Sequence, residues 1–312
     1  MKMYITKSGS LTTVQDEGRF GYMEYGISES GAMDRVSYNE ANKLIGNMNG
    51  EAALEFTLMG SDILFDADTI IAYMGAEMNA RIDDVPIERG KAYRIKEGQK
   101  LMFGFAEEGI RSYLAVAGGI DVPVVMGSRS TNLKCRLGGY YGRKLVAGDE
   151  MLIGEFDIKE REQLVNNSIN VKEYPHNIRV RAIKGPQDDY YTEAGLNAFF
   201  NTPYTVSVDS DRMGIRLKGE SIESKNGMDI VSDGITFGSV QVTSSGLPII
   251  LMADHQTTGG YAKIATVVKD DLQYLAQARP GDTVSFECVS INDMKKGFWN
   301  KLFDGNKKEG VL

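Results

Sequence analysis

The residues best suited to chemistry are gathered in one short segment, residues 254–263, with the sequence DHQTTGGYAK. It follows an apolar run that predicts a strand, so it begins where a rigid element ends. Thr257 and Thr258 supply hydroxyl groups, Gln256 an amide, and Lys263 a positive charge. The glycine pair would let the backbone turn sharply and present N–H groups to a carboxylate or phosphate oxygen. A hairpin turn with polar side chains explains the same residues equally well.

Two other polar loops contain an arginine that can bind an oxyanion. Residues 15–21 (QDEGRFG) place Asp16 and Arg19 in a glycine-rich loop. An arginine can hold an oxyanion with two hydrogen bonds, and an aspartate can orient it or accept a proton. Residues 209–214 (DSDRMG) offer Arg212 as a second clamp. Each loop has a plainer explanation, because an arginine beside aspartates is more often part of a structural ion pair.

Several familiar kinds of catalytic site are absent from the sequence. It contains no GxxxxGK[ST] phosphate loop, no GxGxxG fingerprint and no GxSxG nucleophile elbow. His176 and His255 are the two histidines, and neither has metal-ligand spacing with another histidine or a cysteine. We therefore expect no metal site.

Charge and hydropathy narrow the classes of partner. A net charge of −8 argues against nucleic acid. No run approaches 18 apolar residues and the N-terminus lacks a signal peptide, so we expect no membrane association and a cytoplasmic protein. Cys135 and Cys288 are expected to be buried free thiols. A solvated C-terminal tail is expected at a cluster of basic residues: Lys295, Lys296, Lys301, Lys307 and Lys308.

The elements that must position these residues are predicted to be mainly strands. Many short apolar runs are punctuated by glycine, and this pattern favours a barrel or a sandwich over a parallel α/β sheet. A helix is expected at residues 34–47, with Asp34 as its cap, and shorter helices at residues 192–200 and 269–278. The expected strands lie at residues 53–58, 63–65, 70–74, 101–105, 112–116, 180–183, 205–208, 249–252 and 283–286.

The length of 312 residues exceeds the usual size of one domain. Similar pairs of a turn and a strand recur in both halves, which suggests two barrel-like lobes. We expect an N-terminal β lobe at residues 1–165 and a C-terminal β-barrel lobe at residues 175–312. The charged, Asn-rich residues 155–178 carry few strand signals and are the expected linker.

Ten segments, read in order, resemble one known family. They are TTVQDEGRFGY, GISESGAMDRVSYNEANKLIGN, AALEFTLMG, LAVAGGIDVP, GSRSTNL, GRKLVAGD, KGPQDDYYT, SDRMGIRLKG, ADHQTTGGYAKIATV and RPGDTVSF. The sequence is similar to the biotin-dependent carboxyltransferase family. This family includes the C-type subunit of bacterial 5-oxoprolinase, allophanate hydrolase subunit 2, the KipI antagonist KipA and a carboxyltransferase segment of urea carboxylase. The agreement of all ten segments in order makes the resemblance specific.

The resemblance implies a cyclophilin-like β-barrel architecture and an enzyme subunit that is active only with partners. The implied partners are a B-type (KipI-like) subunit and an A-type subunit of 5-oxoprolinase. The implied reaction is the ATP-dependent opening of 5-oxo-L-proline to L-glutamate, with ATP as a substrate of the complex. The B-type and C-type subunits would activate the lactam, and the A-type subunit would support hydrolysis of the ring.

Roles for the polar residues of the matching segments follow from this chemistry. A cyclic amide with a carboxylate needs an oxyanion clamp, a group that matches the amide and a proton acceptor. Arg19 and Arg212 would clamp an oxyanion, and Gln256 would pair with the amide. Asp16 or Asp34 would accept a proton. The threonine hydroxyl groups and the backbone of the glycine pair would hold a carboxylate or phosphate. The expected catalytic residues are Asp16, Arg19, Asp34, Gln256 and Lys263, and the expected substrate-binding residues are Arg212, Thr257, Thr258, Gly259, Gly260 and Tyr261.

Two alternatives stay open at the level of the sequence. The first is a carboxyltransferase subunit that acts on urea or a related amide with carboxybiotin, and only this alternative requires biotin. The second is a regulatory protein that antagonises a KipI-type kinase inhibitor by sequestering it. An assay of the complex with a B-type protein separates this last function from the enzymatic ones.

Overall fold

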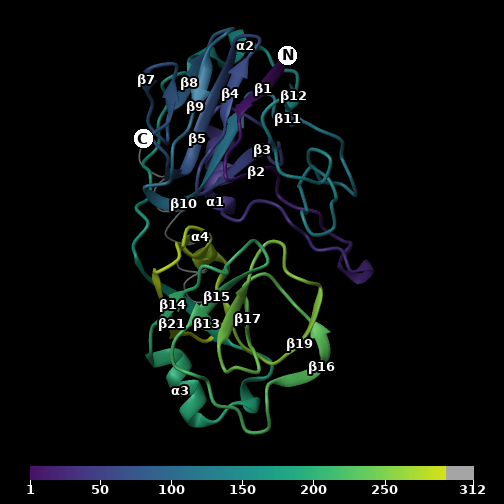
Figure 1. Ribbon diagram of the computed structural model, residues 1–312, viewed down its shortest axis with the longest axis vertical. Coiled ribbons are helices and arrows are strands. Elements are labelled where there is room, and N and C mark those ends of the chain that lie inside the picture. The colour runs from purple at the N-terminus through teal and green to yellow at the C-terminus, as the bar shows by residue number, and fades with distance from the viewer. Residues whose placement is uncertain (293–312) are drawn as a thin grey trace, which may run out of the picture.

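The chain folds into two lobes stacked along its longest axis (Figure 1). The structure is a computed structural model that describes residues 1–292. The N-terminal lobe contains two β-sheets, and the C-terminal lobe contains a closed barrel with a two-stranded ribbon at its side. The predicted mainly β class with few short helices is therefore confirmed. The basic cluster at Lys295–Lys308 lies outside the described residues.

The N-terminal lobe is built from two sheets that face each other. Their facing side chains form one apolar core, which includes Ile5, Phe56, Phe65 and Tyr73. The seven-stranded sheet has the order β11 (Ile120–Asp121), β12 (Glu150–Ile153), β1 (Lys2–Lys7), β4 (Asp62–Phe65), β9 (Lys100–Met102), β6 (Arg81–Ile82) and β7 (Val85–Pro86). The five-stranded sheet has the order β2 (Leu11–Gln15), β3 (Ala53–Thr57), β10 (Glu108–Val116), β5 (Thr69–Glu77) and β8 (Ala92–Ile95).

Helix α1 (Arg35–Leu44) covers the outer face of the five-stranded sheet. Asp34 caps it as predicted, because its carboxylate accepts hydrogen bonds from the backbone N–H groups of Val36 and Ser37. Tyr38 and Ala41 recur at helical spacing and pack on the sheet. The sheet is thus covered on both faces, which explains why β5 is apolar along most of its length instead of alternating.

The C-terminal lobe is a seven-stranded closed barrel. Strand β13 pairs in parallel with β21 and antiparallel with β20, and these pairings close the ring. The rings of Phe199 and Phe286 stack in the apolar core of this lobe with centroids 4.3 Å apart. The strand order is β13 (Asn177–Lys184), β20 (Lys263–Val267), β17 (Ser239–Val242), β18 (Pro248–Leu251), β15 (Gly214–Lys218), β14 (Tyr204–Val206) and β21 (Thr283–Cys288).

The remaining elements are a ribbon and short helices. The ribbon pairs β16 (Asp229–Gly234) with β19 (Thr258–Tyr261) at the flank of the barrel (Figure 1). The α-helices besides α1 are α2 (Ile158–Arg161), α3 (Glu193–Asn201) and α4 (Leu272–Ala276), and the 3-10 helices are η1 (Met23–Tyr25), η2 (Glu162–Leu164), η3 (Asp188–Tyr190) and η4 (Lys269–Asp271). The helices predicted at residues 192–200 and 269–278 correspond to α3 and to η4 with α4. None of the helices in the described part of the chain is long and apolar enough to cross a membrane.

Residues 155–178 contain α2 and η2 and do not hang free between the lobes. Backbone hydrogen bonds join Asn166 and Asn167 to Ala92 in β8, at the edge of the five-stranded sheet. This part of the chain therefore also covers a sheet edge. The division into domains at these residues stays a prediction.

Two expectations need correction. A barrel was expected in each lobe, but the N-terminal lobe has two separate sheets, and only the C-terminal sheet closes. The cysteines were expected to be buried, yet both are exposed free thiols. Cys288 ends β21, where the alternation of buried and exposed residues stops after Phe286, so its side chain lies beyond the barrel core.

Candidate functional site

The segment of residues 254–263 runs through three different environments. It starts at Asp254 in the contact between the lobes, continues past His255 in the wall of a cavity, and then forms β19 of the ribbon. It ends at Lys263, the first residue of barrel strand β20. The sequence-predicted site is therefore spread along the barrel surface.

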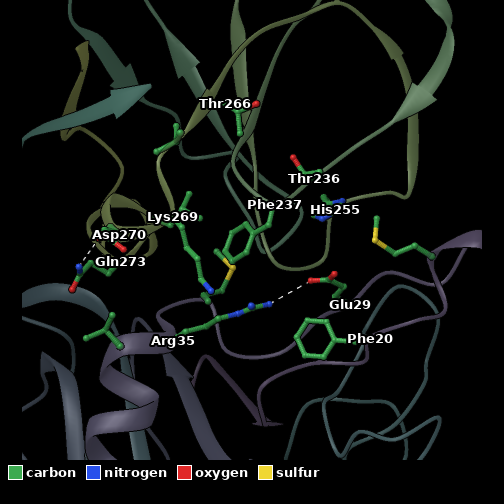
Figure 2. A pocket seen from close by; sticks show the side chains of 15 residues that line it. Phe20, Glu29, Arg35, Thr236, Phe237, His255, Thr266, Lys269, Asp270 and Gln273 are labelled. Atoms are coloured by element: carbon green, nitrogen blue, oxygen red, sulfur yellow. Dashed lines mark hydrogen bonds and ion pairs between the residues drawn. The ribbon is translucent and has the colours of Figure 1, made fainter. Parts of the chain in front are cut away.

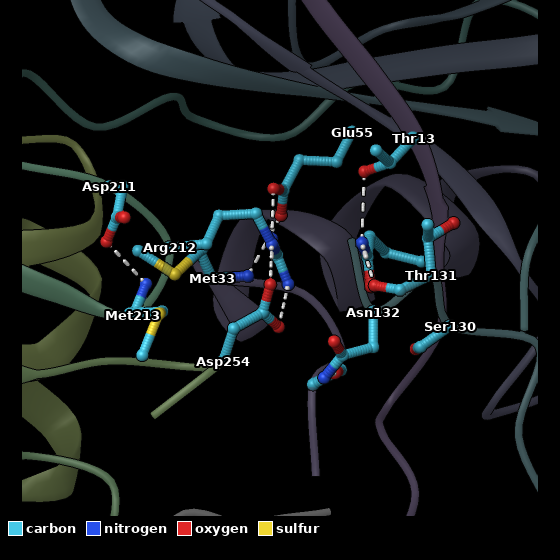
Figure 3. Close-up of polar contacts among 12 residues, drawn as sticks. Thr13, Met33, Glu55, Ser130, Thr131, Asn132, Asp211, Arg212, Met213 and Asp254 are labelled. Atoms are coloured by element: carbon cyan, nitrogen blue, oxygen red, sulfur yellow. Dashed lines mark hydrogen bonds and ion pairs between the residues drawn. The ribbon is translucent and has the colours of Figure 1, made fainter. Parts of the chain in front are cut away.

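Arg212 is buried where the lobes meet, and we call its contact region with Gly31, Glu55 and Asp254 the seam (Figure 3). Its Nε and Nη2 atoms donate to the Asp254 carboxylate at 2.9 and 3.1 Å, and Nη2 also donates to the carbonyl of Gly31 at 2.6 Å. Its Nη1 donates to Glu55 of β3. Burial by itself lowers the pKa of Arg212, but the two carboxylates outweigh it and leave the pKa raised. Protein groups thus take up most of this guanidinium's hydrogen-bonding capacity.

Asp16 and Arg19 hold a loop of the N-terminal lobe. The Asp16 carboxylate accepts hydrogen bonds from the hydroxyl groups of Ser128 and Ser130. Arg19 is fully buried and donates to the carbonyls of Val125 and Ser130, both at 2.9 Å. Burial lowers the pKa of Arg19, and the charge of Asp16 opposes this in part. The two side chains share a loop, but they are engaged with it and not with each other.

Asp34 is engaged at the other end of the seam. Besides capping α1, its carboxylate accepts hydrogen bonds from Ser37 Oγ at 2.6 Å and from Nε2 of Gln277 at 2.9 Å. Gln277 follows α4 in the barrel lobe, so this contact joins the lobes. Burial raises the pKa of Asp34, and these hydrogen bonds oppose the shift. The structure does not bring Asp34 to the 254–263 segment.

Lys263 fastens the ribbon to the barrel. Its side chain is 5% exposed, and its Nζ donates to Asp233 Oδ2 at 2.5 Å and to the carbonyl of Gly234 at 3.1 Å. Both acceptors lie at the end of β16. The hydrogen bond from Lys263 lowers the pKa of Asp233, whose own side chain is half exposed.

Gly259 and Gly260 do not form the predicted turn. They lie in the extended strand β19, because the distant strand β16 supplies a pairing partner. Gly259 is needed there for space, since an added Cβ would lie 2.6 Å from Ile235 Cδ1 and 2.7 Å from Gln241 Nε2. Beside this crowded backbone, Gln256 and Thr258 are exposed. The ribbon therefore presents polar side chains to solvent but no glycine-turn cradle.

A cavity of about 550 Å³ lies between the lobes, beside the start of this segment (Figure 2). Its size falls in the range of small-molecule sites. Its floor comes from residues 20–36 of the N-terminal lobe and its roof from residues 236–273 of the barrel lobe. The side chains that set its chemistry are Phe20, Glu29, Arg35, Phe237, His255 and Lys269, and apolar side chains such as Met33, Val36 and Leu272 complete the walls.

Arg35 is the central charged group of this cavity. Its guanidinium lies 5.5 Å from the ring centroid of Phe20 and 5.4 Å from that of Phe237, so it is held between aromatic rings of the two lobes. Figure 2 shows it directed towards Glu29, whose carboxylate lies 3.5 Å from Nη2. Its Nε is buried and has no hydrogen-bond partner among the described residues.

His255 is the second polar group that the barrel contributes. It is almost fully buried, and its Nδ1 lies 2.7 Å from the carbonyl oxygen of Gln256. A carbonyl only accepts, so Nδ1 is the donor in this contact, and Nε2 is the other ring nitrogen that a ligand could meet. Among residues 1–292, no group of three or more His, Cys, Asp and Glu side chains is placed to hold a metal ion.

Sequence reasoning missed most of this cavity. Arg35 directly follows the predicted cap of α1, and His255 lies inside the predicted segment, but neither was chosen as a site residue. Phe20 and Phe237 carry no local signal of function. They are more than 200 residues apart and meet only because the lobes dock.

Comparison with known proteins places these features in a family. The family profile "Carboxyltransferase domain, subdomain A and B" matches residues 25–288, so the chain belongs to this family. It is 41% identical over 292 residues to the C-type subunit of 5-oxoprolinase from Escherichia coli, a match that covers 94% of this chain and 93% of that protein. It is 38% identical to the protein of the same name from Haemophilus influenzae, over 92% of this chain and 91% of that one.

A solved structure supports the same assignment of fold. The crystal structure of the Kluyveromyces lactis urea carboxylase superposes with a TM-score of 0.85 at 29% sequence identity. The match covers 100% of this chain and 30% of that chain. The two-lobed architecture is therefore shared with a part of that longer chain.

Proposed function

We propose that this member of the carboxyltransferase family is the C-type subunit of an ATP-dependent 5-oxoprolinase, which converts 5-oxo-L-proline to L-glutamate together with A-type and B-type subunits. The observation that carries the proposal is the 41% identity to the C-type subunit of 5-oxoprolinase from Escherichia coli, which extends over more than nine-tenths of both chains. A match of this extent includes both lobes, the seam and the cavity.

The reaction sets requirements that the cavity can meet. A lactam resists attack by water, and transfer of the γ-phosphoryl group of ATP to its carbonyl oxygen turns that oxygen into a leaving group. Water adds to the activated carbon, the C–N bond breaks, and the ring nitrogen takes a proton to become an amino group, which leaves γ-glutamyl phosphate. A second water molecule then hydrolyses this acyl phosphate to L-glutamate and inorganic phosphate. A partly enclosed cavity with apolar walls favours this route because it limits access of bulk water.

We propose that the interlobe cavity binds 5-oxo-L-proline. The apolar side chains Met33, Val36 and Leu272 would contact the ring methylenes, and His255 Nε2 would accept a hydrogen bond from the ring N–H. A small ligand with a single amide and a single carboxylate needs few polar contacts for its orientation.

The residues predicted from the sequence take two kinds of role in this proposal. Asp16, Arg19, Asp34 and Arg212 would hold the loops and the seam that shape the cavity, in accordance with their contacts to protein groups. The exposed polar face of the ribbon, with Gln256, Thr257, Thr258 and Tyr261 beside Lys263, Gly259 and Gly260, would meet the substrate's reacting side or another protein of the complex. ATP would be a substrate of the complex, and cytoplasmic localisation stays a prediction.

The second candidate function is carboxyl transfer to urea or a related amide. The observation that favours it is the superposition on the Kluyveromyces lactis urea carboxylase with a TM-score of 0.85. Under this alternative, carboxybiotin would be delivered on a separate carrier protein, since this chain corresponds to 30% of that enzyme.

The test is a reconstituted assay. The chain is purified with its A-type and B-type partners, and phosphate release is measured with and without 5-oxo-L-proline, next to a mixture that lacks this chain. We expect 5-oxoproline-dependent ATP hydrolysis and L-glutamate formation only in the complete mixture. A complete complex that hydrolyses no ATP in response to 5-oxoproline, or that transfers carboxyl groups from carboxybiotin to urea, contradicts the proposal.

A further inference from the structure

Arg35 is firmly positioned in the interlobe cavity but only partly hydrogen-bonded. We propose that it anchors the carboxylate of the substrate and thereby selects carboxylate-bearing cyclic amides over neutral amides such as urea. The inference rests on the proposed function and adds to it a specificity-determining residue. It also separates the two candidate functions, because urea has no group for this anchor.

The aromatic contacts fix the guanidinium without using its N–H groups. Phe20 and Phe237 approach to 5.5 and 5.4 Å between the guanidinium carbon and each ring centroid. Such contacts involve the charge and the flat faces, whereas the five N–H donors lie around the edge of the plane. Arg35 is therefore held in place by both lobes while its hydrogen-bonding edge stays available.

Few of the N–H donors of Arg35 are hydrogen-bonded to described protein groups. Among the described residues, the carboxylate within ion-pair distance of it is that of Glu29, at 3.5 Å from Nη2, which is the long limit of a hydrogen bond. Nε is enclosed and has no partner among the described residues. A buried donor without a partner is costly, and a ligand carboxylate with its two oxygens matches the fork of an arginine. The observed geometry thus leaves donors for an anionic ligand.

Basic and acidic side chains are balanced in number around the cavity. Lys269 and Asp270 line the barrel side, and Glu29 lines the opposite side. The two basic side chains of the lining, Arg35 and Lys269, equal in number its two acidic side chains, Glu29 and Asp270. Arg35 and Glu29 are only about one-quarter exposed, so their interactions are less screened than those of surface charges. A ligand carboxylate can therefore bind beside Arg35.

A site that offers hydrogen bonds to one group discriminates against analogues that lack it, because its own polar groups then lose their partner. For this cavity the relevant analogue is 2-pyrrolidinone, which has the lactam ring of 5-oxoproline and no carboxylate. We therefore expect Arg35 to contribute to the binding of 5-oxoproline and not to the binding of 2-pyrrolidinone.

The experiment measures binding of 5-oxo-L-proline and of 2-pyrrolidinone to the full chain by calorimetry. It compares the wild type, Arg35→Met, Arg35→Lys and the control Arg216→Met, which changes an exposed arginine of β15. We expect Arg35→Met to weaken 5-oxoproline roughly ten- to one-hundredfold, as loss of a charged hydrogen bond does, and to leave 2-pyrrolidinone unchanged. Arg35→Lys should be intermediate, and Arg216→Met should match the wild type. Thermal unfolding of each variant verifies the fold.

The same variants in the reconstituted complex give a second readout. Arg35→Met should raise KM for 5-oxoproline by a similar factor with little change in kcat, because a carboxylate anchor acts equally on ground state and transition state. An unchanged KM with wild-type turnover overturns the anchor and leaves the proposed function standing. Arg35-dependent binding of 5-oxoproline to a chain whose complex does not turn it over overturns the proposed function and leaves the anchor standing. Equal affinity of the wild type for both lactams overturns the anchor as well.

Discussion

Two regions between the lobes use arginine in opposite ways. In the seam, Arg212 is 4% exposed and donates to two carboxylates and a carbonyl. In the cavity, Arg35 is held by two aromatic rings, and within residues 1–292 its buried Nε has no hydrogen-bond partner. The type of a residue in a motif thus says less about its role than the state of its hydrogen bonds. A buried arginine whose hydrogen-bond donors are mostly paired with protein groups stabilises the docking of the lobes. An arginine with unpaired donors is available to a ligand.

The largest expected effect comes from breaking the seam. Arg212→Met removes one partner of a buried ionic group and leaves Glu55 and Asp254 without their counter-charge. We expect a loss of about 3–5 kcal/mol in the free energy of unfolding, measured by urea denaturation. The matched control, Arg216→Met at an exposed arginine of the following strand β15, should change it by less than about 0.5 kcal/mol. A decrease of less than about 1 kcal/mol in the free energy of unfolding of Arg212→Met would show that the seam does not stabilise the fold.

A smaller change tests whether the seam depends on complete hydrogen bonding. The buried hydroxyl of Tyr113 donates to Glu55 at 2.7 Å and accepts from the backbone N–H of Asp34 at 2.7 Å. Tyr113→Phe keeps the ring and leaves both groups short of a partner, so we expect a loss of about 1–3 kcal/mol. Tyr141→Phe, at a ring that is 81% exposed, is the control and should have no measurable effect. Equal stability of the two variants would contradict the account of the seam.

The cavity arginine should matter much less for stability. Arg35→Met keeps apolar contact with Phe20 and Phe237 and loses a cation–π interaction worth about 0.5–1 kcal/mol at a partly exposed site. We expect the free energy of unfolding to fall by no more than about 1 kcal/mol in the same urea series. A loss comparable to that of Arg212→Met would show that Arg35 is a second structural tie between the lobes.

The smallest effect concerns the pH dependence of the ribbon. The hydrogen bond from Lys263 holds the pKa of Asp233 below its ordinary value of 3.8. A carboxyl group with a lowered folded-state pKa stabilises the protein above its unfolded pKa, and this contribution is lost as the pH falls through the lowered value. Asp233→Asn should therefore be less stable than the wild type at pH 7, and the difference should shrink towards pH 3. A difference that stays constant with pH, or one that Asp229→Asn reproduces, would rule out this origin.

The predictions from sequence succeeded where the signals were local. The cap at Asp34, the helix after it and the short strands between glycines depend on neighbouring residues, and the structure contains them. The plainer explanation of Arg212, a structural ion pair, also matches its observed contacts.

The predictions failed where distant parts of the chain decide the outcome. Gly259 and Gly260 have the composition of a turn, but pairing with residues 229–234 makes them a strand. Arg35 has no motif of its own, because its environment comes from Phe20 in one lobe and Phe237 in the other. The identity of a motif could be inferred from the sequence, but the cavity beside it depends on how the two lobes dock.

The most direct test of the contrast between seam and cavity is a crystal structure of this chain with 5-oxo-L-proline. The account predicts the ligand in the interlobe cavity, with its carboxylate within hydrogen-bond distance of the Arg35 guanidinium and the contacts of Arg212 unchanged. Ligand bound instead on the ribbon beside Gln256 and Lys263, with no ligand in the cavity, would contradict it.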